Sequence, residues 1–207
     1  MVPVVVFDLG KVLVDFDYSI AARRVAARSS KTVEHLDQFL SGSPFLVQFE
    51  SGQLSPRQFF AEVQKVTGFQ GNDDEFANYF ADIFAPISEM VELQARLSKK
   101  NIPTYIFSNT NEIAVSHVRR NYSFFSGFDG YILSYEVGAM KPQTKIYEAL
   151  ETMAGRRGTD IFYIDDRAEN IQAGADRGWQ VVLHESPKKT RAALEKFLAA
   201  HNGAMQP

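Results

Sequence analysis

The chain has 207 residues, of which 45% are hydrophobic and 23% charged, and its net charge is −3. This length fits one large domain or a core with a modest insertion, and the composition is typical of a globular protein. The absence of cysteine excludes disulfides, thiolate metal sites and a cysteine nucleophile. No long basic run favours a nucleic-acid partner, and no stretch approaches the roughly 20 apolar residues of a membrane span. We therefore expect a cytoplasmic protein, monomeric or homodimeric, that contacts neither nucleic acid nor membrane.

The first predicted element is a strand over Val2–Phe7, which ends at Asp8 and a glycine turn at Gly10. A run rich in β-branched residues is typical of a strand buried on both faces of a parallel sheet. Open α/β sheets bind ligands at the carboxyl ends of their strands. Asp8 is therefore predicted to lie at a ligand site.

The stretch from Phe16 to Phe84 has a different pattern, and no strand is predicted in it. Its apolar residues recur at helical spacing, Thr32 is a predicted helix cap, and Ser55 begins a capping box with proline at the first helical position. We expect residues 17–84 to form a small all-helical cap domain. Residues 1–16 and 85–207 would form the core.

Four further strands are predicted after this insertion, and helical patterns lie between them. One of these helices would carry Pro142 in its first turn. Strands that alternate with helices favour parallel pairing with right-handed crossovers. The expected fold class is α/β, a doubly wound, mostly parallel sheet. The four strands are Pro103–Phe107, Tyr131–Leu133, Ile161–Ile164 and Trp179–Leu183.

Three more polar clusters occur where apolar runs stop or a helix starts. Ser108-Asn109 follows a strand, Lys141 precedes Pro142, and Asp165-Asp166 ends a strand that leads to Asn170. Each cluster alone has an ordinary explanation as a helix cap, a solvated lysine or an Asx turn. Together with Asp8 they favour a phosphate site, and adjacent carboxylates are ligands that suit Mg²⁺.

The four clusters, in this order, resemble the four motifs of the haloacid dehalogenase superfamily. The resemblance spans nearly the whole chain, and the helical insertion resembles the cap of the superfamily's cap-type-1 members. The start Phe7-Asp8-Leu9-Gly10, with the later Ser-Asn-Thr-Asn stretch, resembles the branch that contains α-D-glucose-1-phosphate phosphatases. The resemblance implies a Rossmann-like core and hydrolysis of a small-molecule phosphate ester, with a sugar phosphate among the expected substrates.

The resemblance also implies a role for each motif. Asp8 would attack phosphorus and form an aspartyl-phosphate. Mg²⁺ would be bound by Asp8, the Gly10 carbonyl and Asp166, with Asp165 binding or orienting. Ser108, Asn109 and Lys141, with Leu9 and Gly10, would hold the phosphoryl group, and Asn170 would contact the acid pair.

One departure from the family pattern is Gly10, where most phosphatases of the superfamily carry a second aspartate as general acid and base. The α-D-glucose-1-phosphate phosphatase branch shows the same glycine. Acid–base help is typically worth about 10²–10⁴-fold in rate. The substrate would then have a good leaving group, another acid would substitute, or the protein would be a slow or silent phosphatase. The substitute acids considered are Glu50, Asp15 and Asp17.

Two other functions remain open on the sequence. A 2-haloacid dehalogenase also uses an aspartate nucleophile and lacks the second aspartate, but it needs no metal, which Asp165-Asp166 argue against. A non-catalytic phosphate-binding module is the other, because Gly10 removes a catalytic group.

Overall fold

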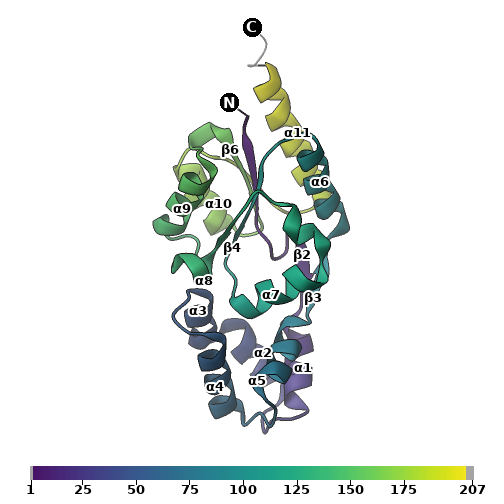
Figure 1. The fold of residues 1–207 in the computed structure, drawn as a ribbon, viewed down its shortest axis with the longest axis vertical. Helices are drawn as coiled ribbons and strands as arrows, with labels where there is room; N and C mark the ends of the chain where they lie inside the picture. The colour runs from purple at the N-terminus through teal and green to yellow at the C-terminus, as the bar shows by residue number, and fades with distance from the viewer. Residues whose placement is uncertain (1, 204–207) are drawn as a thin grey trace.

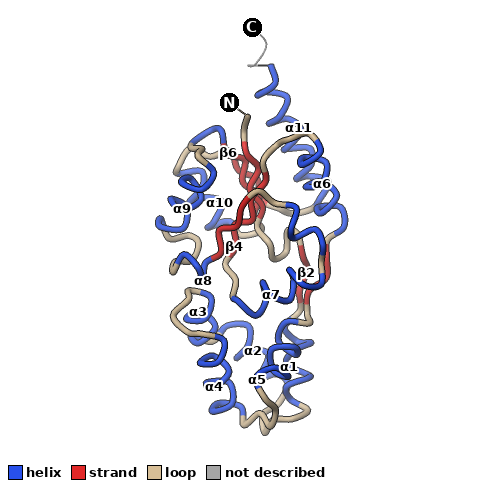
Figure 2. The backbone as a smooth tube through the Cα atoms, viewed as in Figure 1, coloured by secondary structure: helices blue, strands red, loops and turns tan. Residues whose placement is uncertain are grey.

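A computed structural model describes residues 2–203. Its centre is a five-stranded sheet in which every neighbouring pair of strands is parallel (Figures 1 and 2). The predicted doubly wound, mostly parallel sheet is therefore confirmed. In spatial order the strands are β5 (Gly130–Leu133), β4 (Thr104–Ser108), β1 (Val4–Phe7), β6 (Ile161–Asp165) and β7 (Gln180–Leu183).

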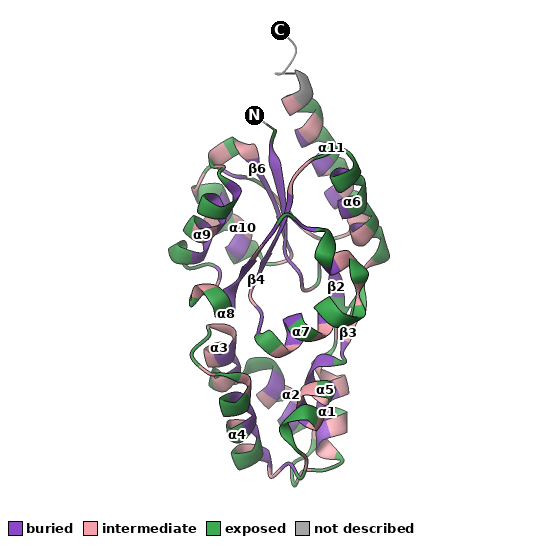
Figure 3. Ribbon diagram, viewed as in Figure 1, coloured by how far each residue is buried: buried purple, intermediate pink, exposed green. Residues whose placement is uncertain are grey.

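Helices cover both faces of this sheet, as the buried strands in Figure 3 show. Side chains alternate between the faces of a strand, so Val5 and Phe7 join one apolar cluster, and Val4 and Val6 join another. The first cluster includes side chains of α6 (Ser88–Lys99), α7 (Glu112–Asn121), the 3₁₀ turn η1 (Ser123–Gly127) and α11 (Pro187–Gly203). The second is formed with α9 (Thr144–Ala154) and α10 (Ala168–Asp176), while the short elements α8 (Ser134–Val137) and η2 (Gly158–Asp160) lie in connections.

The strand register brings the ends of β1, β4 and β6 together. Phe7 is opposite Ile106 on one side and Ile164 on the other. The chain leaves β1 to form β4 and β5 on one side and then returns to form β6 and β7 on the other. Such a reversal of strand order is where open α/β sheets bind ligands.

Five helices at the carboxyl end of the sheet share an apolar cluster of their own, rich in phenylalanine. Phe49 and Phe59 stack there with ring centroids 4.6 Å apart. Thr32 and Ser55 cap their helices, as predicted, and the Ser55 capping box is complete. A cap domain of residues 17–84 stays a prediction, to which this separate cluster gives support. The helices are α1 (Tyr18–Ala26), α2 (Val33–Gly42), α3 (Pro44–Glu50), α4 (Pro56–Thr67) and α5 (Asp73–Ala81).

The expectation that no strand occurs from Phe16 to Phe84 is wrong at both ends. β2 (Val14–Phe16) pairs antiparallel with β3 (Phe84–Pro86), with Asp15 opposite Ala85. Strands of three residues are too short to show an alternating pattern, and their pairing spans most of the insertion. As a result, both connections between the sheet and helices α1–α5 run through one two-stranded ribbon.

The five predicted strands begin or end one or two residues away from the observed ones, and two differences concern named residues. Helix α9 begins at Thr144, so Pro142 precedes the helix instead of occupying its first turn. The main chain of Lys141 is held by the Asn109 side chain, which keeps this segment outside the helix. Trp179 precedes strand β7 and is buried beside Phe107 and Tyr147. Among residues 2–203, no helix has the length and apolar character needed to cross a bilayer.

Candidate active site

Asp8 lies directly after β1 and is fixed there by main-chain contacts. Its N–H donates to the Ile164 carbonyl at 2.9 Å, and its Oδ1 accepts from the Leu9 N–H at 2.7 Å. The residue is only 7% exposed. The Leu9 amide is thus engaged with Asp8 itself and the Leu9 side chain is in the core, so a role for Leu9 in substrate binding stays a prediction.

Lys141 is the buried cation beside Asp8, and its side chain is 1% exposed. Its Nζ lies 3.1 Å from Asp8 Oδ1, 2.6 Å from Asp165 Oδ2 and 2.8 Å from the Phe107 carbonyl oxygen. A lysine ammonium has three N–H donors, and these three acceptors match that number. Lys141 therefore orients the two carboxylates, and its predicted contact with a phosphoryl group would act mainly through charge.

Asn109 fixes the Lys141 segment. Its Nδ2 donates to the Lys141 carbonyl at 3.0 Å, and its Oδ1 accepts from the Lys141 N–H at 2.7 Å. Ser108 ends β4, and its hydroxyl lies 3.3 Å from the Asn109 carbonyl oxygen. Asn109 thus contacts Lys141 although 32 residues separate them in sequence, and Ser108 precedes Asn109 at the end of β4.

Asp165 and Asp166 differ in their surroundings. The carboxylate of Asp165 accepts hydrogen bonds from Tyr163, Asn170, Lys141 and the Arg167 N–H. No side-chain donor among the described residues contacts the Asp166 carboxylate. Asp165 is therefore an orienting group, whereas Asp166 has oxygens free for a ligand. Asn170 lies where the sequence predicts, 3.1 Å from Asp165 Oδ1.

Asp8, Asp165 and Asp166 each offer a carboxylate oxygen within 4.8 Å of the others. These three carboxylates outnumber the Lys141 ammonium and the Arg167 guanidinium, which also acts on Asp166, so the cluster has excess negative charge. Hard oxygen ligands at a strand end suit a small divalent cation. The donor set of these three carboxylates therefore fits a metal ion.

The pKa values reflect this crowding. Burial raises the pKa of Asp8 to about 7; Lys141 opposes the rise, and Asp165 and Asp166 add to it. The pKa of Asp166 is also raised, mainly by burial and secondly by repulsion from Asp165. Burial disfavours the charged form of Lys141, but the negative charges of Asp8 and then Asp165 outweigh it and raise the Lys141 pKa. Burial likewise disfavours the charged form of Asp165, but Lys141 and the hydrogen bonds to the carboxylate outweigh it and lower the Asp165 pKa. A nucleophilic carboxylate at Asp8 thus benefits from any added positive charge.

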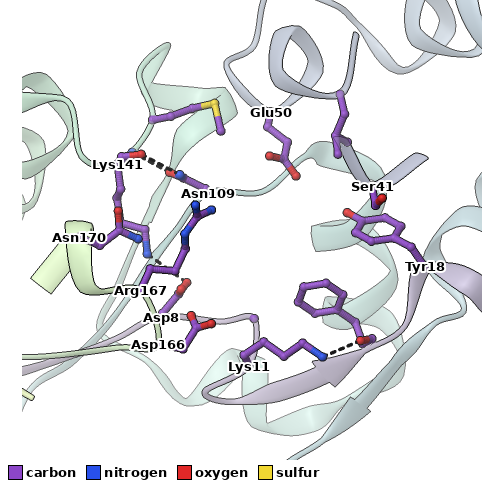
Figure 4. Close-up of a pocket in the computed structure, with 14 residues that line it drawn as sticks. Asp8, Lys11, Tyr18, Ser41, Glu50, Asn109, Lys141, Asp166, Arg167 and Asn170 are labelled. Atoms are coloured by element: carbon purple, nitrogen blue, oxygen red, sulfur yellow. Dashed lines mark hydrogen bonds and ion pairs between the residues drawn. The ribbon is translucent and has the colours of Figure 1, made fainter. Parts of the chain in front are cut away.

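A cavity of about 480 Å³ opens over this cluster, between the strand ends and helices α1–α3 (Figure 4). A smaller adjoining cavity of about 60 Å³ is lined by Ser108 and shares Gly10 and Glu50 with it. Sequence motifs do not identify several polar side chains of the larger cavity, because no strand end or motif marks them. These are Lys11, Tyr18, Ser41 and Arg167.

Of the three acids considered as substitutes for the missing aspartate, only Glu50 lines the cavity. Asp15 pairs with Lys11 at 2.5 Å and accepts from the Phe16 N–H. Asp17 caps helix α1 by accepting from the Ser19 N–H at 2.9 Å. Both carboxylates are therefore already used in local contacts away from the cluster.

The chain matches known proteins over most of its length. The family model of the haloacid dehalogenase-like hydrolases matches residues 2–178. D-ribitol-5-phosphate phosphatase of Bacteroides thetaiotaomicron is 24% identical over 96% of this chain and 99% of its own. A sesquiterpene phosphatase of Aspergillus oryzae is 24% identical over 86% of this chain and 87% of its own.

Solved structures show the same fold. A haloacid dehalogenase family enzyme from Bacteroides thetaiotaomicron, crystallised with magnesium and inorganic phosphate, superimposes with a TM-score of 0.78 at 22% identity. The match covers 88% of this chain and 93% of that one. The finer resemblance to α-D-glucose-1-phosphate phosphatases is not identified by these matches and stays a prediction.

Proposed function

Since this chain belongs to the haloacid dehalogenase-like hydrolases, we propose that it is a Mg²⁺-dependent phosphatase that hydrolyses a small phosphorylated metabolite through an aspartyl-phosphate at Asp8. The observation that carries the proposal is the cluster of Asp8, Asp165 and Asp166 around buried Lys141. The two curated relatives named above are phosphatases, which supports the same reaction class.

The metal ion would be held by Asp8, Asp166 and the Gly10 carbonyl, with Asp165 kept in orientation by Lys141 and Asn170. When bound, it would supply positive charge that eases the approach of an anionic nucleophile to a phosphate. The similar fold crystallised with magnesium and phosphate supports this choice of ion. The hydrogen bonds around Asp165 explain why Asp166 is the better candidate for direct binding.

The protein's own groups would position the reaction. Asp8 would attack phosphorus, and Ser108 and Asn109 would hold the phosphoryl oxygens by hydrogen bonds. Lys141 would offset the charge of Asp8 and of the transferring group. Phosphoryl transfer depends mainly on positioning and on charge stabilisation, and the site offers both. Water would then hydrolyse the aspartyl-phosphate and restore Asp8.

The cavity supports a hydroxylated substrate, such as a sugar or polyol phosphate. Beyond the carboxylate cluster it presents Lys11, Tyr18, Ser41, Glu50 and Arg167, all of which can hydrogen-bond to hydroxyl groups. A volume of about 480 Å³ suits a small metabolite. The relative that acts on D-ribitol 5-phosphate agrees with this class better than the sesquiterpene phosphatase does.

The test is a phosphate-release screen over sugar, polyol, nucleotide and acyl phosphates, with Mg²⁺ and with EDTA. We expect release with Mg²⁺ only, and none from Asp8→Asn, because an amide cannot serve as the nucleophile. Undiminished turnover by Asp8→Asn would overturn the nucleophile. Chloride release from 2-chloropropionate with EDTA present would favour the dehalogenase instead, and phosphate-dependent thermal stabilisation without turnover would favour a binding module.

A further inference from the structure

We propose that Glu50 is the proton donor for the leaving oxygen and thereby replaces the second aspartate that Gly10 lacks. This inference rests on the proposed phosphatase function. It assigns a catalytic residue on helix α3, outside the four motifs at the strand ends.

Position 10 has no room for a side chain. A Cβ atom on Gly10 would lie 2.8 Å from Phe16 Cε1, closer than carbon atoms approach without contact strain. The Phe16 ring is itself packed edge-on against Tyr18 and Phe84, with centroids 5.5 and 5.9 Å away. An acid at position 10 would therefore displace a ring held on two sides, and the proton donor must come from elsewhere.

Among the described residues, the acids that line the cavity are Asp8, Asp166 and Glu50. Asp8 is the proposed nucleophile, and Asp166 is a proposed metal ligand on the same side of the cavity. Neither is free to donate a proton to the leaving group. Glu50 is the remaining acid.

Glu50 is the last residue of α3, and its carboxyl group points into the cavity from across the space above Asp8 (Figure 4). In an in-line displacement, the leaving oxygen departs on the side opposite the nucleophile. That side is formed by Glu50 and its neighbours. No side-chain donor within the described part of the chain contacts its carboxyl group, so the group is available to a bound substrate.

The main chain of Glu50 is attached to the sheet side of the molecule. Ser134 Oγ lies 2.6 Å from the Glu50 carbonyl oxygen and donates to it, and the same hydroxyl accepts from the Thr110 N–H at 2.9 Å. Two residues after Glu50, Gly52 has φ +73°, and a Cβ atom on Gly52 would lie 2.2 Å from the Tyr135 carbonyl oxygen. This contact admits glycine only. Glu50 is thus positioned by the loop after β4 and by α8.

The surroundings of Glu50 favour its protonated form. Burial raises the pKa of Glu50 to about 7, and the positive charge of Arg167 opposes the rise. Tyr18 also faces it, and its own pKa is raised by burial and by Glu50. A carboxylic acid with a pKa near the working pH is suited to general acid–base catalysis.

An Asp8 oxygen forms a bond to phosphorus while the bond from phosphorus to the leaving oxygen breaks. The electron pair stays on that oxygen, which takes the Glu50 proton and leaves as an alcohol. The Glu50 carboxylate then takes a proton from water as the water oxygen attacks phosphorus, which releases phosphate and the Asp8 carboxylate.

The test compares leaving groups. Glu50→Gln keeps the size of the side chain but removes the proton, and Glu62→Gln removes a cap carboxylate outside the cavity as a control. For each variant, kcat/KM is measured on 4-nitrophenyl phosphate, whose leaving group needs no proton, and on the best alkyl phosphate from the screen. We expect Glu50→Gln to lose about 10²–10³-fold on the alkyl phosphate and less than about threefold on the aryl phosphate.

The outcomes separate the two proposals. An equal loss on both substrates, or no loss on either, would overturn the role of Glu50, whereas Glu62→Gln should match the wild type on both. Thermal melting of Glu50→Gln would show whether a general loss comes from unfolding. If Asp8→Asn abolishes turnover while Glu50→Gln changes nothing, the proposed function stands and this inference fails. If Asp8→Asn remains active, the proposed function fails first.

Discussion

Lys141 Nζ lies 2.6 Å from Asp165 Oδ2, and the two side chains are 1% and 0% exposed. An ion pair this deeply buried stabilises little by itself, because desolvation offsets the attraction. Its importance lies in what either partner would do alone, since an unpaired charge at this depth is strongly unfavourable. The pair also fixes the Lys141 ammonium 3.1 Å from Asp8.

Lys141→Met is predicted to destabilise the protein and abolish phosphate release. It leaves Asp8 and Asp165 buried near each other without a cation, and breaking such a pair typically costs about 3–5 kcal/mol. Urea unfolding at pH 7.5 measures the change. Lys189→Met is the control, because its pair with Glu185 is exposed at the surface and should change stability by less than about 1 kcal/mol.

Asp166→Asn is predicted to weaken Mg²⁺ binding more than it weakens folding. Among the described residues no side-chain donor contacts the Asp166 carboxylate, so the substitution removes the proposed metal ligand without breaking a side-chain hydrogen bond. We expect the Mg²⁺ concentration for half-maximal activity to rise at least about tenfold. Asp165→Asn should weaken folding more than it weakens Mg²⁺ binding, with a larger loss of unfolding free energy than in Asp166→Asn. Equal metal affinity in Asp166→Asn and wild type would contradict the assignment.

Glu50 is predicted to make stability fall with rising pH. Its pKa is about 7 in the folded protein, above the ordinary value of 4.5, so the unfolded chain loses this proton first. The contribution of Glu50 to the unfolding free energy is therefore fully present below pH 4.5, and it decreases as the pH rises from 4.5 to about 7. In EDTA, Glu50→Gln should raise the unfolding free energy at pH 8 by about 1–3 kcal/mol relative to its effect at pH 4.5. No dependence of this difference on pH would contradict the pKa shift.

Gly10→Ala is predicted to be destabilising by about 1–3 kcal/mol, because its Cβ would press on the Phe16 ring. Phe16→Leu should relieve the contact, so the double variant should lose less than the sum of the two single variants. Denaturant titration of all four proteins forms the cycle. Simple additivity would show that Phe16 is not what restricts position 10.

The residues at strand ends could be predicted from sequence because parallel strands deliver their carboxyl ends to one edge. Asp8, Ser108 and Asp165 follow apolar runs that are visible as such, and the register then brings them together. Arg167 lines the cavity but was not predicted, because no motif marks it. Its aim into the cavity depends on the turn into α10.

Glu50 and the β2–β3 ribbon could not be located with the same means. The place of Glu50 depends on a hydrogen bond from Ser134, 84 residues away in sequence. The ribbon consists of three-residue strands whose pairing joins positions on either side of the helical insertion. In both cases the contact that fixes the position joins residues far apart in sequence, so local residue patterns do not predict it.

The ribbon of β2 and β3 contains both covalent connections between helices α1–α5 and the sheet. A rotation of these helices about the ribbon would move Glu50 relative to Asp8 and would break the hydrogen bond between Ser134 and the Glu50 carbonyl. The proposed acid and nucleophile would then face each other only in the arrangement that keeps the Ser134 hydrogen bond, and phosphoryl transfer in any other arrangement would lack its proton donor.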